Sequence, residues 1–151
     1  MRNFIGFMLL VLILAGCSNE ATTISKGWSV TPTIDLKINN EKGEELSDKW
    51  IGETGRLAIS NNPFIEGKAQ KYMWLLWGNQ NDLVGKSFKV IATSEKGEEK
   101  TVLSDRTLGG SNWGAQASLP SMITLPTLGL WKLDAFVENK LHGTIIVKVG
   151  L

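Results

Sequence analysis

Short runs of alternating apolar and polar residues constrain the fold of this chain more than any other feature. Gly, Asn and Pro punctuate the gaps between the runs, which are residues 33–39, 56–60, 87–94, 130–138 and 143–149. Alternation with a period of two puts every second side chain on the same face of a β-strand. Several short strands separated by turn signals are typical of a β-sandwich or a β-barrel. No long stretch beyond residue 16 has helical spacing, so the sequence predicts an all-β domain.

The sequence EKGEE occurs twice, at residues 41–45 and 95–99. A glycine that follows two polar residues suits a short hairpin loop in which one residue has a positive φ. We therefore predict one hairpin turn at Gly43 and another at Gly97. The flanking residues share little beyond strand character, so we interpret the repeat as two uses of one turn rather than a duplicated domain. An acidic binding loop is the alternative interpretation, although each copy also carries a lysine.

The segment KYMWLLWGN, residues 71–79, is apolar on both faces of the strand that it predicts. A strand of this kind is normally covered on both sides or packs against a partner. We expect the long loop at residues 108–130, which contains several glycines and prolines, to fold over its outer face. Trp74 and Trp131 lie in alternating rows and are expected in the core, where a tryptophan buries a large area.

Two other tryptophans are candidates for a binding surface. Trp77 ends the apolar segment, and Trp113 lies in the loop that is expected to cover it. We expect the two rings to lie close together, with Asn112 and Gln116 at a polar rim. An apolar groove with polar edges is what a ligand or partner would use. If both tryptophans pack fully, they belong to the core instead.

The start of the chain has the pattern of an export signal. Arg2 precedes an apolar stretch at residues 4–14, which is too short to span a membrane but has the length of a signal-peptide core. The residues that follow are similar to a bacterial lipobox, namely Leu14, Ala15, Gly16 and Cys17. This resemblance implies that the Cys17 thiol receives a diacylglyceryl group and that a peptidase cuts before it.

The lipobox resemblance sets the expected domain organisation and location. We expect a lipoprotein signal peptide at residues 1–16, a lipid-anchored tether at 17–27 and a β-sandwich domain at 28–151. The side chains of the tether are mostly small and polar, which suits a flexible spacer. The expected location is the outer, extracytoplasmic face of the cell membrane, where two acyl chains hold a protein more stably than one.

Composition argues against several classes of function. Cys17 is the only cysteine, so a processed chain has no disulfide and no cysteine metal ligand. Without Arg2 the 16 basic residues become 15, which equals the 15 acidic residues and gives no reason to expect nucleic-acid binding. His142 is the only histidine and lacks a companion ligand or nucleophile. Residues 78–82 lack the glutamate that a calcium loop needs. We expect no cofactor, no metal and no catalytic residue.

The C-terminal half of the chain resembles a known group of proteins. The segments MWLLWG, LVGKSFKVIATSEKGEE and LPSMITLPTLGLWKLDAFVENKLHGTIIVKV are similar to a family of small, uncharacterised lipoproteins from low-GC Gram-positive bacilli. The resemblance covers residues 63–151 and the leader. It implies an immunoglobulin-like β-sandwich on the outer side of the cytoplasmic membrane, and it implies no established activity.

These observations favour a non-enzymatic binding or interaction module of the cell envelope. Its expected partners are the membrane, through the lipid anchor, and an envelope protein or a glycan. The alternative is an accessory enzyme or an inhibitor of an envelope hydrolase. An enzyme needs convergent titratable groups in a pocket, whereas a binding module needs an exposed aromatic or apolar patch. The sequence has surplus tryptophan but no matched nucleophile and base.

Overall fold

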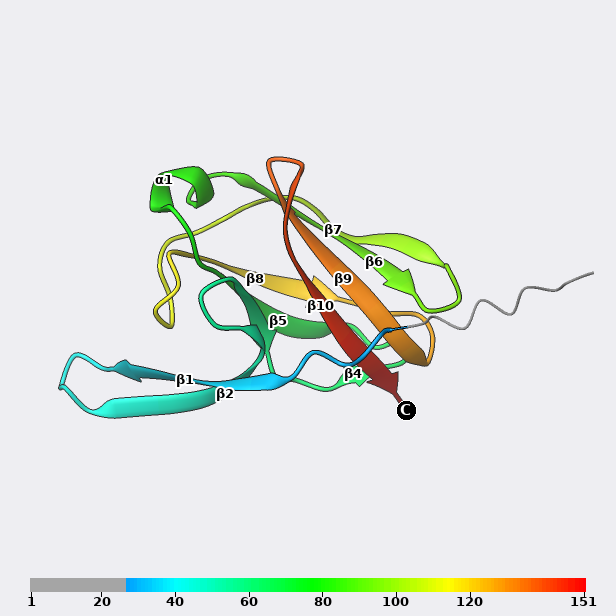
Figure 1. The fold of residues 1–151 in the computed structure, drawn as a ribbon, viewed down its shortest axis with the longest axis horizontal. Helices are drawn as coiled ribbons and strands as arrows, with labels where there is room; N and C mark the ends of the chain where they lie inside the picture. The colour runs from blue at the N-terminus through cyan, green and yellow to red at the C-terminus, as the bar shows by residue number, and fades with distance from the viewer. Residues whose placement is uncertain (1–26) are drawn as a thin grey trace, which may run out of the picture.

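The computed structural model describes residues 27–151, so the predicted signal peptide, the lipobox with Cys17 and nearly all of the tether lie outside the described residues. The chain forms two five-stranded sheets that pack face to face (Figure 1). The strands are β1 (Thr33–Asn39), β2 (Glu45–Glu53), β3 (Leu57–Ser60), β4 (Phe64–Ile65), β5 (Gln70–Leu76), β6 (Ser87–Ser94), β7 (Glu99–Thr107), β8 (Ala117–Ile123), β9 (Gly129–Val137) and β10 (Lys140–Gly150). The prediction of an all-β sandwich is confirmed.

The order of the strands is that of an immunoglobulin-like sandwich with one added hairpin. One sheet has the order β1-β2-β3-β5-β8, and the other has the order β4-β10-β9-β6-β7. β3 and β4 divide the first strand of the sandwich between the two sheets, since β3 pairs with β5 and β4 pairs in parallel with β10. The remaining strands follow the Greek-key arrangement of immunoglobulin-like domains. β1 and β2 extend the first sheet beyond that arrangement.

The main core lies between the two sheets and is built on large aromatic side chains. Trp74 and Trp131 are both fully buried, which confirms their predicted place in the core. The Trp74 ring meets Phe88 edge-on, with centroids 5.5 Å apart. Both indole N–H groups have partners, because Trp74 donates to the Ser121 hydroxyl and Trp131 donates to the Thr127 carbonyl. Buried rings therefore bring no unpaired donor into this core.

The two EKGEE segments form matching hairpin turns, as predicted. Gly43 has φ 78° and Gly97 has φ 88°. In the first turn the Asn40 N–H donates to the Glu44 carbonyl, and in the second the Ser94 N–H makes the equivalent bond to Glu98. The first turn joins β1 to β2 and the second joins β6 to β7, in different sheets. The repeated sequence therefore forms the same type of hairpin turn at two positions and does not mark a duplicated domain.

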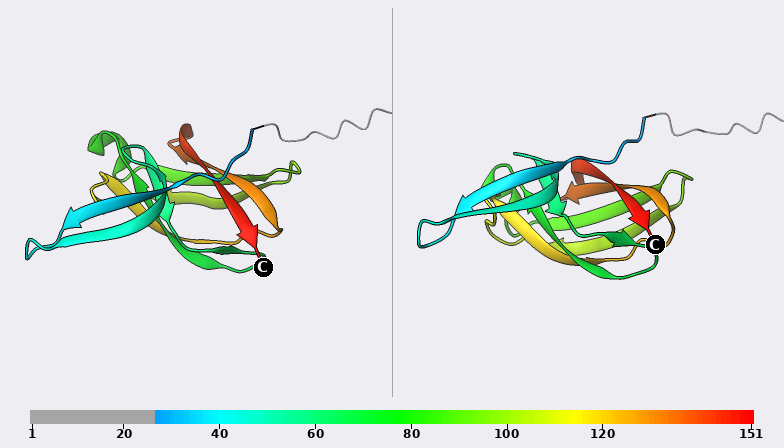
Figure 2. Two further views of the ribbon diagram at one scale, coloured as in Figure 1. Left: turned by 60° about the horizontal axis from the view of Figure 1, so that its bottom comes forward. Right: turned by 90° about the horizontal axis from the view of Figure 1, so that it is seen from below.

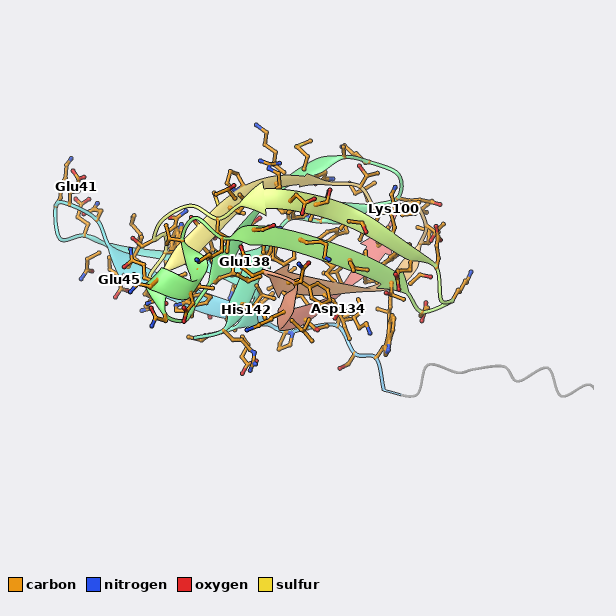
Figure 3. The ribbon with its side chains drawn as sticks, turned by 90° about the horizontal axis from the view of Figure 1, so that it is seen from above. Glu41, Glu45, Lys100, Asp134, Glu138 and His142 are labelled. Carbon is orange, nitrogen blue, oxygen red and sulfur yellow. The ribbon has the colours of Figure 1, made fainter. Side chains whose placement is uncertain are left out.

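The β1–β2 hairpin projects from one end of the sandwich, while the first described residues enter at the other end (Figures 1 and 2). Glu41 lies at the tip of this hairpin and Glu45 lies along it, away from His142 on the body of the sandwich (Figure 3). Lys37 pairs with Glu45 across the strands at 2.9 Å, and the hydrogen bond that Lys37 donates to this carboxylate raises the pKa of Lys37. Charged side chains of this kind discourage another chain from pairing with an exposed edge strand.

The segment at residues 108–130 differs from its prediction as a covering loop. It contains β8, which pairs antiparallel with β5 at the edge of the sheet and does not lie over its outer face. The inward positions of β8 are buried, but Pro120 and Ser121 hide this alternation in the sequence. Proline is tolerated here because β8 is an edge strand, where a ladder hydrogen bond is not needed on both sides.

One short helix interrupts the β structure. α1 (Gln80–Leu83) is a single turn, and the Asn79 side chain caps it by accepting a hydrogen bond from the Asn81 N–H. The sequence predicted no helix here, because four residues are too few for helical periodicity to be recognised. In the part of the chain that the structure describes, no helix has the length and apolar character needed to cross a membrane.

A second, smaller apolar cluster covers the outer face of β5. Its buried members come from β1, β2, β3, β5 and the loop before β8, and they are Leu36, Trp50, Ala58, Leu75 and Ala115. Trp77 and Trp113 are half-buried against this cluster. The outer face is therefore covered as expected, but mainly by the added hairpin and by the few residues around Trp113. We call this group the outer cluster.

Candidate functional site

A cleft of about 470 Å³ opens where the β1–β2 hairpin, α1 and the loop before β8 meet. The first described residues enter the sandwich at the opposite end (Figures 1 and 2). The cleft is lined by Ile38, Asn39, Gln80, Ser111, Asn112, Trp113, Gly114, Ala115 and Gln116. Three of the four residues predicted as a binding surface, Asn112, Trp113 and Gln116, are thus brought together.

Trp113 lies at the tip of a tight turn in an unusual backbone conformation. Asn112 and Ala115 exchange two backbone hydrogen bonds of 3.1 and 2.8 Å, which close a two-residue loop. Trp113 has φ 46° and Gly114 has φ 80°, as a type I′ turn requires. Such positions favour Asn, Asp and Gly, and a left-handed conformation costs other residues about 1–2 kcal/mol. The backbone is therefore strained at the residue that carries the aromatic ring.

The outer cluster holds this ring from behind. The Trp113 and Trp50 ring centroids lie 5.8 Å apart, with the ring planes tilted by 57°. Trp50 is only 4% exposed, whereas Trp113 is half-buried and also lines the cleft. Within residues 27–151, the Trp50 indole nitrogen is buried without a hydrogen-bond partner. Trp113 is thus neither a core residue nor a loose surface side chain.

Gln116 connects the cleft to the end of β5. Its side-chain oxygen accepts a hydrogen bond of 3.1 Å from the Gly78 N–H. This contact fixes the chain just after Trp77, which also packs against the outer cluster. Trp77 itself lines a different cleft, together with Arg56 and His142. Trp77 and Trp113 thus pack on the same cluster, and the ring that Trp113 contacts is that of Trp50.

The lining of the cleft beside Trp113 is uncharged and rich in amides. No Asp, Glu, Lys, Arg or His is among its residues. The described residues provide no hydrogen bond to the side chains of Asn39, Gln80, Ser111 and Asn112. An amide group offers both donors and an acceptor, and a hydroxyl offers both as well. The cleft therefore presents an aromatic ring surrounded by neutral groups that can both donate and accept.

His142 occupies a structural position on β10, in the sheet that faces β5. Its ring Nε2 lies 2.9 Å from the Arg56 carbonyl oxygen, and the Arg56 Nε donates to the His142 carbonyl at 3.2 Å. These two contacts fasten the β9–β10 hairpin to the turn between β2 and β3. Among residues 27–151 there is no group of three or more His, Cys, Asp or Glu arranged to hold a metal ion.

Sequence reasoning missed the contribution of the hairpin and of α1 to the cleft. Ile38 and Asn39 come from the end of β1, and Gln80 begins α1. These three residues carry no local signal of a site, because their proximity to Asn112 depends on how the hairpin packs onto the sandwich. The unusual composition around Trp113 was the only part of the site visible in the sequence.

Comparison with known proteins places the chain in a family. The family model described as "Domain of unknown function (DUF4871)" matches residues 27–147. The chain belongs to the DUF4871 family. The expectation of an uncharacterised family is thereby confirmed, and DUF4871 covers nearly the whole of the sandwich. A comparison with the curated proteins found no match.

A solved structure shares the fold of this DUF4871 chain. It is the X-ray crystal structure of a protein from Bacillus anthracis that is described as a putative lipoprotein. The two chains are 20% identical, the TM-score is 0.58, and the match covers 82% of this chain and 87% of the other. At this identity the similarity establishes the fold alone.

Proposed function

We propose that this chain is a lipid-anchored binding module on the outer face of the cytoplasmic membrane, and that the cleft beside Trp113 is its binding site. The observation that carries the proposal is the conformation of Trp113. A tryptophan in the left-handed region strains the backbone, and such strain concentrates at functional sites where the surrounding structure enforces it. A turn selected for stability alone would carry Asn or Gly at this position.

The sequence and the shape of the molecule support the anchored arrangement. Leu14, Ala15, Gly16 and Cys17 have the lipobox pattern, and the similar protein from Bacillus anthracis is described as a putative lipoprotein. The described chain starts at the end of the sandwich opposite the β1–β2 hairpin (Figure 2). An anchor attached through this start would therefore present the cleft away from the membrane, towards the cell wall.

The composition of the cleft favours binding over the accessory-enzyme alternative. Acid–base catalysis needs a titratable group within hydrogen-bond reach of the reacting atoms. The cleft offers one hydroxyl, that of Ser111, among amides, an indole and aliphatic groups. His142 is outside this cleft and is occupied by the Arg56 carbonyl. A neutral, partly aromatic lining suits recognition of a ligand more than its conversion.

The anchor is tested by metabolic labelling of the full chain with a palmitate analogue. Wild-type protein should carry the label in the membrane fraction. Cys17→Ala should lose the label and leave an unprocessed precursor, because the thiol that accepts the lipid is absent. An unchanged label in Cys17→Ala would contradict the lipid-anchored part of the proposal.

The binding site is tested with a soluble protein of residues 27–151, which contains both sheets and both apolar clusters. This protein should co-sediment with isolated cell-envelope fragments of a bacillus, and Trp113→Ala should reduce the bound fraction. Trp28→Ala is the matched control, because Trp28 is a half-exposed tryptophan that packs on Lys132, away from the cleft. Equal retention of both variants would contradict the assignment of the site.

A further inference from the structure

We infer that the cleft beside Trp113 binds a neutral glycan, with a sugar ring stacked on the exposed part of the indole and its hydroxyl or acetamido groups bonded to the surrounding amides. This inference rests on the proposed function and names the ligand class of the same site. The lining of the cleft is uncharged, its amide and hydroxyl groups can both donate and accept, and its aromatic ring is held in place.

The charge of the lining selects for a neutral ligand. Four other clefts on the described part of the chain each include at least one charged side chain, such as Lys86, Glu53, Arg106 or Lys148. The cleft beside Trp113 includes none. An anionic ligand, such as a phosphate-containing polymer, would find no opposing charge there, and anion sites usually provide Arg, Lys or a row of backbone N–H groups.

The free hydrogen-bonding groups match the chemistry of a sugar. Asn39 approaches from β1, Gln80 from α1, and Ser111 and Asn112 from the loop before β8. Each of these side chains can both donate and accept, as sugar hydroxyl and acetamido groups can. Apolar side chains contribute only Ile38, Trp113 and Ala115 to the lining, so an apolar peptide side chain would find little surface to bury.

The aromatic ring is held rigidly enough to act as a platform. The two hydrogen bonds between Asn112 and Ala115 fix the backbone on both sides of Trp113, and Trp50 packs behind its ring. A ring that is already fixed loses little conformational freedom when a ligand stacks on it. The cleft volume of about 470 Å³ also lies within the range of about 300–1,000 Å³ found for small-molecule sites.

The inference is tested by isothermal titration of residues 27–151 with two neutral oligosaccharides, chitotetraose and maltotetraose. At least one should bind in a saturable manner. Trp113→Ala should weaken binding by about tenfold or more, and Asn112→Ala should weaken it by a smaller factor. Trp28→Ala should bind as the wild type does. Because the ligand is neutral, Kd should change less than about twofold between about 50 and about 500 mM salt.

The outcomes separate this inference from the proposed function. Trp113→Asn should lose binding as Trp113→Ala does. Because Asn tolerates the left-handed conformation of this turn, a loss of binding in Trp113→Asn is not explained by a turn that fails to fold. If neither oligosaccharide binds while envelope co-sedimentation still depends on Trp113, the proposed site stands and the neutral-glycan inference is wrong. If a photo-crosslinker placed at position 113 captured an envelope protein, the ligand would be a protein and the inference would be wrong. If envelope binding fell steeply with salt, the ligand would be an anionic polymer and the inference would also be wrong.

Discussion

The rings of Trp50 and Trp113 lie 5.8 Å apart and join two parts of the chain that belong to different elements. Trp50 comes from β2 of the added hairpin, and Trp113 comes from the turn before β8. Their contact sits in the outer cluster, which is separate from the core between the sheets. The hairpin and the turn therefore support each other, and the cleft between them depends on this contact.

Trp50→Ala should loosen the hairpin more than the sandwich. Truncation of a buried tryptophan costs about 3–5 kcal/mol, and Trp50 is 4% exposed. Because the outer cluster is small and separate, we expect the amides of β1 to lose hydrogen-exchange protection while those of β9 keep it. Trp131→Ala, in the main core, is the control and should reduce protection in both sheets. Uniform loss in Trp50→Ala would show that the hairpin and the sandwich unfold as one unit.

Two substitutions of Trp113 should separate backbone strain from side-chain packing. Trp113→Ala and Trp113→Asn both remove the contact with Trp50, but only Asn tolerates the left-handed conformation at φ 46°. Trp113→Asn should therefore be more stable than Trp113→Ala by about 1 kcal/mol in denaturant unfolding. Equal stabilities would mean that the turn relaxes when the indole is absent. A loss of about 3–5 kcal/mol in both variants would instead assign Trp113 to the core.

The fold could be predicted because its signals are local. Alternation in residues 33–39 or 87–94 is a property of adjacent residues, and the glycine of each EKGEE segment requires the backbone that its turn provides. β8 was missed because Pro120 and Ser121 interrupt the apolar pattern, and their tolerance depends on the edge position of the strand and on the Trp74 N–H that reaches Ser121. Neither condition can be recognised before the sheet is assembled.

The cleft could be predicted only in part for the same reason. Asn112, Trp113 and Gln116 are neighbours in the sequence, and a tryptophan among Gly, Asn and Gln is unusual enough to be noticed. Asn39 and Gln80 reach the cleft only because the hairpin packs on the outer cluster and α1 follows β5. Their positions are set by tertiary contacts, which leave no pattern in the local sequence.

Gly52→Ala should be strongly destabilising. Gly52 lies where the hairpin joins the sandwich, with φ 153°, and a Cβ there would overlap the Leu57 carbonyl oxygen and lie 2.6 Å from the Ala58 Cα. Backbone atoms cannot move aside cheaply, so we expect a loss of at least about 2–3 kcal/mol in denaturant unfolding. Gly150→Ala is the matched control, since a Cβ there meets nothing within 4 Å. A mild effect at Gly52 would show that β2 and β3 can separate without unfolding the domain.

Tyr72 should make the stability of the domain fall at high pH. Its side chain is 2% exposed, its hydroxyl donates to the Pro63 carbonyl at 2.8 Å, and its ring stacks on Phe64. Burial raises the pKa of Tyr72 from its ordinary value of 10.0 to about 12, because the charged phenolate is poorly solvated there. The folded state therefore holds a proton that the unfolded chain releases between about pH 10 and about pH 12.

The sign of the effect follows from this difference in bound protons. Below about pH 10 both states are protonated and the contribution of Tyr72 is complete, whereas above it each pH unit removes up to about 1.4 kcal/mol until the folded pKa is reached.

Tyr72 is the only tyrosine in the chain, so absorbance of the phenolate reports on this residue alone. In the folded protein the phenolate should form near pH 12, and in denaturant near pH 10. Tyr72→Phe should be less stable by about 1 kcal/mol at neutral pH, because the Pro63 carbonyl loses its donor. The same variant should lose less stability than the wild type between about pH 10 and about pH 12. Lysines also titrate in this range, but they contribute equally to both proteins, so the difference between the two reports on Tyr72. A phenolate that forms near pH 10 while the protein is still folded would show that the Tyr72 hydroxyl is open to solvent.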